Sequence, residues 1–183
     1  SDRKRLNNTE LLIWVGPEIE PYLAKVIEAS KVEHMTMLDE HADHGEEEHH
    51  DDHKGHDHAG LHPWLDIEAV EHFAEELSAE LQHHFPNKAS QIKENEAAFL
   101  ASLKEFENRA KAQLEPLHQN GFLVFHDAYD GFVNHFELNQ VGYFTVSPEL
   151  KPGAKHLAEL REKLEHSGVS CVFKEPQFKP ALI

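Results

Sequence analysis

The sequence is poor in basic residues. Lysine and arginine together number 17 against 34 aspartates and glutamates, which gives a formal net charge of −17 over 183 residues. Nucleic acids and anionic membrane surfaces both attract basic patches, so this balance argues against either as a partner. Cations are the better match for so acidic a chain.

Other absences narrow the range of architectures. No apolar run approaches the ~20 residues of a membrane-spanning helix, so we expect no direct insertion into a membrane. No signal peptide is visible, and the single cysteine, Cys171, cannot form an intramolecular disulfide. Both ends of the sequence are abrupt, which leads us to expect a fragment of a longer protein. Its length still suffices for one large or two small domains with a core.

Short apolar runs alternate with helical patterns along the chain. The runs typical of buried strands are LLIWVG (11–16), FLVFH (122–126), VGYFTV (141–146), VSCVF (169–173) and, more weakly, VEHMTML (32–38). Helical spacing is present in residues 17–30, 66–85, 128–136 and 152–168. Strands that alternate with helices predict an α/β fold with mostly parallel sheets.

One helical pattern is much longer than the others and extends from Lys88 to about Leu117. At 1.5 Å per residue such a helix would be about 45 Å long, which exceeds the width of a small domain. We therefore predict two α/β lobes joined by one long rigid helix. The N-terminal lobe would comprise residues 1–86, the linking helix 87–118 and the C-terminal lobe 119–183, with both lobes truncated.

The stretch from about residue 39 to 60 combines histidines with carboxylates and almost no large apolar residues, so we expect a mobile surface loop. Its histidines are His41, His44, His49, His50, His53, His56 and His58. Near neutral pH an imidazole has a free lone pair for a borderline metal, and carboxylates offset the charge of the cation. The stretch predicts several weak, exchangeable sites for zinc, copper or nickel. A solvated acidic linker or a purification tag is the alternative, although a tag would be terminal and purely histidine.

Two histidines outside this loop are candidates for fixed metal ligands. His62 lies in LHPWLD at the start of a predicted helix, for which Asp66 is the predicted N-cap. His126 ends a predicted strand, and ligands of open α/β folds bind beyond the carboxyl ends of strands. Asp127 is expected to cap the next helix or to orient an imidazole. Glu175, at another strand end, is a weaker candidate ligand.

Several motifs in order carry a resemblance to a known family. They are SDRKRL, WVGPEIE, the histidine-rich insert, HPWLD, the long helix, FHDAYDGF, GYFTVSPELKPG and CVFKEPQF. Together they resemble the ZnuA-type periplasmic zinc-binding proteins, the cluster A-I solute-binding components of ABC transporters. The resemblance covers essentially the whole chain.

This resemblance implies that Zn2+ is held between two lobes by three histidines, two of which match His62 and His126. The third would precede Ser1, and Cys171 would match half of a disulfide whose other cysteine lies beyond Ile183. Manganese-binding relatives usually carry glutamate at the position of His126, so histidine favours zinc, as its softness also does. The implied function is zinc capture in the periplasm, by a monomer, and delivery to the membrane permease of an ABC transporter.

Two other functions compete with this one. A periplasmic metal buffer or chaperone would use the histidine-rich loop as its main site. A zinc hydrolase needs an open coordination position and a positioned base. The chain has no HExxH motif and no serine or cysteine nucleophile motif, so we predict a protein that is not an enzyme.

Overall fold

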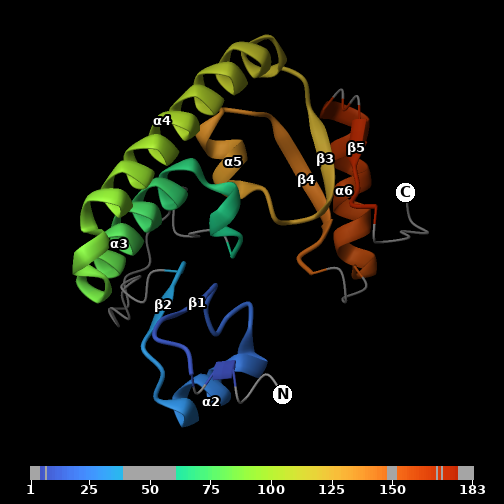
Figure 1. Cartoon of the computed structure of the whole chain (residues 1–183). Coiled ribbons are helices and arrows are strands. Elements are labelled where there is room, and N and C mark those ends of the chain that lie inside the picture. Colours follow the sequence, from blue (N-terminus) through green and yellow to red (C-terminus); the bar gives the residue numbers. More distant parts are fainter. Residues whose placement is uncertain are drawn as a thin grey trace, which may run out of the picture. The chain divides into compact units, whose positions relative to one another are not determined.

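The computed structural model describes residues 5–6, 8–38, 61–147, 152–167, 169 and 171–176 (Figure 1). The chain forms two compact units. Unit 1 comprises residues 1–64 and 68–98, and unit 2 comprises residues 65–67 and 99–183. Each contains a small parallel sheet, so the predicted α/β fold with parallel sheets is confirmed.

Unit 1 begins with a βαβ arrangement. Strand β1 (Leu12–Trp14) pairs in parallel with β2 (His34–Thr36), and helix α2 (Pro21–Ser30) connects them. The helical pattern predicted from residue 17 becomes helix only at Pro21, because proline is suited to the first turn of a helix. The buried side chains of Trp14 and Ile27 contribute apolar surface to this unit.

Two long helices follow the histidine-rich stretch. The short 3-10 turn η1 (Pro63–Leu65) precedes α3 (Ile67–His84), and α3 agrees with the helix predicted at residues 66–85. A second turn, η2 (Pro86–Lys88), leads into α4 (Ala89–Leu114), and η3 (Glu115–Leu117) follows it. The predicted long helix is therefore present but about 39 Å long at 1.5 Å per residue, since its predicted ends form the tighter turns.

The sheet of unit 2 has the strand order β4-β3-β5, with every pairing parallel. Its elements are β3 (Phe122–His126), α5 (Asp130–His135), β4 (Gln140–Thr145), α6 (Ala154–Ser167) and β5 (Cys171–Phe173). Because β3 has a neighbour on each side, its Leu123 and Val124 are almost wholly buried. Leu123 packs with Phe125, Phe144 and Leu160 of α6, which lies alongside β4 (Figure 1).

Among the described residues, no helix has both the length and the hydropathy needed to cross a membrane.

Candidate metal centre

His126 is the last residue of the central strand of unit 2. It pairs in register with Thr145, the last residue of β4, so the carboxyl ends of these parallel strands lie side by side. On the other side, β5 ends at Phe173, and Glu175 follows two residues later. The sheet therefore presents a histidine and a carboxylate at the edge where open α/β proteins bind ligands.

The side chains of His126 and Glu175 lie close together. The Nδ1 atom of His126 is 3.6 Å from Oε1 of Glu175, and both side chains are largely buried. The hydroxyl of Tyr129 donates a hydrogen bond of 3.2 Å to the same carboxylate oxygen. Burial raises the pKa of Tyr129 above its ordinary value of 10.0, and the negative charge of Glu175 raises it further. Tyr129 thus remains a neutral donor that holds Glu175 beside the histidine.

The second carboxylate oxygen of Glu175 has a different environment. Oε2 is buried and has no hydrogen-bond partner among the described residues. A buried polar oxygen without a partner is costly, and a missing ion or water is one physical explanation for it. A carboxylate and an imidazole that are both largely buried are donors that suit a borderline divalent cation such as Zn2+.

Asp127 is not the helix N-cap that the sequence predicted. Helix α5 begins at Asp130 with Tyr129 at the N-cap position, so the prediction that Asp127 caps the helix is wrong. The backbone N–H of Asp127 instead donates to the carbonyl of Thr145, which extends the ladder beyond His126. Its Oδ1 accepts a 3.4 Å hydrogen bond from Gln140. Two further residues separate the strand end from the helix, which removes Asp127 from the capping position.

His62 is placed by the turn that precedes α3. Pro63 starts η1, and the ring of His62 meets the ring of Trp64 edge-on with centroids 5.1 Å apart. His62 belongs to unit 1 and His126 to unit 2, and the structure describes each histidine within its own unit. The seven histidines predicted to collect metal, His41 to His58, lie outside the described residues.

One contact within unit 2 joins the segments that follow these two histidines. A Cβ atom built on Gly131, in the first turn of α5, would lie 2.5 Å from Cβ of Asp66 and 2.8 Å from its Oδ2. Asp66 directly precedes α3. The close packing of Asp66 against α5 therefore requires glycine at position 131.

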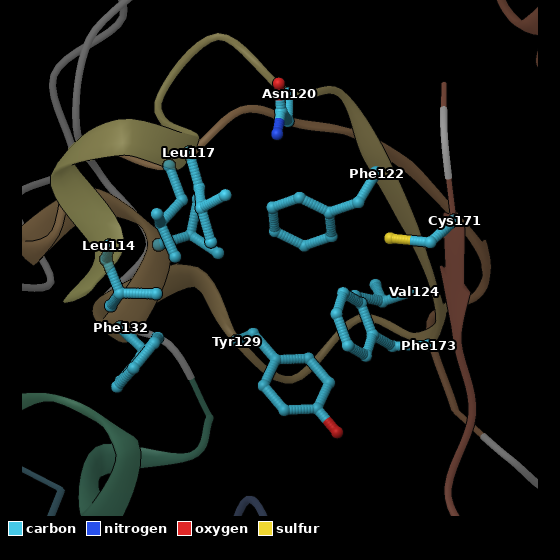
Figure 2. Close-up of a pocket in the computed structure, with 11 residues that line it drawn as sticks. Leu114, Leu117, Asn120, Phe122, Val124, Tyr129, Phe132, Cys171 and Phe173 are labelled. Atoms are coloured by element: carbon cyan, nitrogen blue, oxygen red, sulfur yellow. The ribbon is translucent and has the colours of Figure 1, made fainter. Parts of the chain in front are cut away.

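Unit 2 also contains an apolar cavity of about 400 Å3 (Figure 2). Its walls include Leu114, Leu117, Phe122, Tyr129, Cys171 and Phe173. The sulfur of the free Cys171 points toward Phe122 in Figure 2. No histidine or carboxylate belongs to the described residues that line this cavity, so it does not have the chemistry of a cation site.

An α/β fold with a histidine and a carboxylate at the carboxyl ends of parallel strands is typical of proteins that bind ligands at that edge of the sheet. The chain matches the family model described as ZnuA, zinc-uptake complex component A, periplasmic, over residues 1–183, and it belongs to this family. It is 39% identical over 207 residues to the high-affinity zinc uptake system protein ZnuA of Yersinia pestis. That alignment covers 100% of this chain and 65% of the relative, so the chain spans just under two thirds of that protein.

Solved structures show the same fold. A crystal structure of ZnuA superposes with a TM-score of 0.76 at 24% identity, covering 97% of this chain and 67% of the other. A Zn(II)-bound variant of AdcAII from Streptococcus pneumoniae gives a TM-score of 0.71 at 19% identity, with 94% and 65% coverage. The fold and family predicted from the motifs are therefore confirmed.

Proposed function

We propose that this protein captures zinc in the periplasm and delivers it to the membrane permease of an ABC transporter. Family membership and the zinc-uptake names of its relatives support this function. The structural observation that carries it is the close approach of the largely buried side chains of His126 and Glu175 at the carboxyl ends of the strands. The protein binds zinc as cargo and is not an enzyme.

In this proposal His126 and His62 are zinc ligands. A histidine that binds a metal commonly directs its other ring nitrogen toward a carboxylate, which fixes the orientation of the ring. Nδ1 of His126 faces Glu175, so Glu175 is the positioning residue and the Nε2 atom of His126 binds the ion.

We also propose roles for the histidine-rich loop and for the two lobes. Residues 39–60 act as an auxiliary collector, whose seven histidines and interspersed carboxylates give weak and rapidly exchanging sites. Residues 1–86 and 119–183 are parts of two lobes, with 87–118 as the linking helix. We further propose that the protein is a monomer.

The test is a competitive zinc titration of metal-stripped protein against a chromophoric chelator. Five proteins are compared: the full chain, a variant lacking residues 41–58, His62→Ala/His126→Ala, Glu175→Gln, and the control His72→Ala/His118→Ala. We expect the loopless variant to keep one tight site. The first double variant should bind zinc at that site at least ~100-fold more weakly, and Glu175→Gln about 10–100-fold more weakly. The control pair should match the full chain.

The opposite pattern would support the metal buffer. If deletion of residues 41–58 abolishes zinc binding while His62→Ala/His126→Ala changes nothing, the loop is the main site. The seven loop histidines are the feature that favours this second candidate.

A further inference from the structure

Three side chains of types that bind metals meet in unit 1. Glu80 and His84 lie one turn apart on α3, and Glu33 comes directly before β2. The Nε2 atom of His84 is 3.1 Å from Oε1 of Glu80 and 3.4 Å from Oε2 of Glu33. One ligand atom from each residue lies within 4.8 Å of the other two. We call Glu33, Glu80 and His84 the α3 triad.

The backbone holds all three members of the α3 triad in place. The spacing of four residues puts Glu80 and His84 on one face of α3. The carbonyl of Glu33 accepts a 2.8 Å hydrogen bond from the N–H of Leu12, next to the ladder between β1 and β2. Helix α3 and the backbone next to the β1–β2 ladder therefore set the positions of the three residues, and these positions do not depend on contacts among the three side chains.

The nitrogen of His84 has an unusual environment. Nε2 is buried and makes no hydrogen bond within the described part of the chain, although two carboxylate oxygens lie within 3.4 Å. The side chain of His84 is 18% exposed, against 31% for Glu80 and 60% for Glu33. Such short separations without hydrogen-bond geometry mean that the ring nitrogen does not aim directly at either oxygen.

These separations agree with shared coordination of one ion. A tetrahedral zinc ion with bonds of about 2.0–2.2 Å holds its ligand atoms ~3.4 Å apart. The distances from Nε2 to the two carboxylates are close to this value. In such an arrangement the nitrogen lone pair aims between the oxygens at the ion. Two carboxylates would also neutralise the charge of a divalent cation.

We propose that the α3 triad is a second metal site, which binds a first-row divalent cation such as zinc through one imidazole and two carboxylates. Water completes the coordination, and the exposure of Glu33 makes the site weaker than a buried one. The bound ion joins the segment before β2 to the end of α3. This inference does not depend on His126 or on transport.

A metal-free ion pair is the competing explanation. A protonated His84 between two carboxylates would produce the same three side-chain positions without an ion. In the ion pair, Nε2 of His84 carries a proton, whereas in the metal site Nε2 is bonded to the ion. The state of this nitrogen at neutral pH therefore distinguishes the two explanations.

The experiment uses long-range proton–nitrogen NMR of the imidazole rings in the full 15N-labelled chain, with free zinc set by a metal buffer. Buffering keeps the loop histidines from depleting the ion. His83, adjacent on α3 and exposed, is the internal reference, and variants of single histidines assign the signals. We expect the ring nitrogens of His84 to shift at a lower free zinc concentration than those of His83.

Matched variants then test the carboxylates. Glu33→Gln and Glu80→Gln keep the side-chain size and should raise the zinc midpoint of His84 by at least about tenfold, whereas His83→Gln should leave it unchanged. The proposal is overturned if His84 responds together with His83, if it does not respond at all, or if both glutamine variants keep the original midpoint. The signals of His126 in the same spectra report on the transport site separately.

Discussion

Glu107, on helix α4, is a buried carboxylate with a lowered pKa, so it stays ionised near neutral pH. Its two oxygens accept hydrogen bonds from Lys104 and Lys111 on the same helix, and Nε2 of His135 lies 3.1 Å from Oε1. The lysine hydrogen bonds lower the pKa of Glu107 to about 2, against burial, which raises it. His135 is the last residue of α5, so this single carboxylate connects two helices of unit 2.

The low pKa of Glu107 has a consequence for acid stability. A carboxylate whose pKa is lower in the folded state stabilises the fold above its unfolded pKa of about 4.5, and this contribution disappears as the pH falls toward 2. Glu107→Gln should lower the free energy of unfolding by about 1 kcal/mol at pH 7, because solvent screens the half-exposed lysines. Urea titrations should show this difference shrinking between pH 5 and pH 2.

The neighbouring Glu105 provides the control for this prediction. It pairs with Arg109 on the exposed face of α4, so Glu105→Gln should change the unfolding free energy by less than about 0.5 kcal/mol at any of these pH values. A Glu107→Gln effect that stays constant down to pH 2 would contradict the role of its charge.

At the scale of elements, Gly131 determines how closely α5 packs against the start of α3. A methyl group there would meet Cβ of Asp66, an atom next to the backbone that cannot rotate away. Gly131→Ala should therefore lower the free energy of unfolding by about 1–3 kcal/mol through overpacking. Gly153→Ala is the matched control, because its added methyl group would meet no atom within 4 Å. Equal urea midpoints for the two variants would show that the contact can relax.

Elements of this fold could largely be predicted from the sequence, because apolar runs and helical spacing are local signals. The strand that ends at His126 and the helix after Asp66 are examples. Asp127 was wrongly predicted to be the helix N-cap because three residues of irregular backbone, 127–129, separate β3 from α5. The neighbours of a side chain are not local information. Glu175 was only a weak candidate, and the meeting of Glu33 with His84 depends on contacts between residues 51 positions apart.

The whole molecule is dominated by negative charge, and much of this charge belongs to the histidine-rich stretch. Residues 41–58 contain seven carboxylates and one lysine, so their removal changes the net charge from −17 to −11. These carboxylates have two separable roles, because they can bind zinc directly and can also attract it from a distance. Attraction over distance is screened by salt, with a Debye length of about 10 Å at 0.1 M ionic strength, whereas direct ligation is far less sensitive.

Steering by charge predicts that zinc association with the tight site depends on the loop only at low ionic strength. A variant with the seven carboxylates of residues 41–58 changed to amides keeps every histidine but loses most of the local field. In stopped-flow measurements at about 0.01 M salt, where the Debye length is about 30 Å, it should bind zinc several-fold more slowly than the full chain. The two rates should converge as salt rises above about 0.15 M. Changing the seven histidines to glutamine instead leaves the charge intact, so this control should keep the fast rate and lose only the weak loop sites. If the histidine variant is the slow one at every salt concentration, zinc reaches the tight site by transfer from the loop imidazoles, and the carboxylates do not steer it.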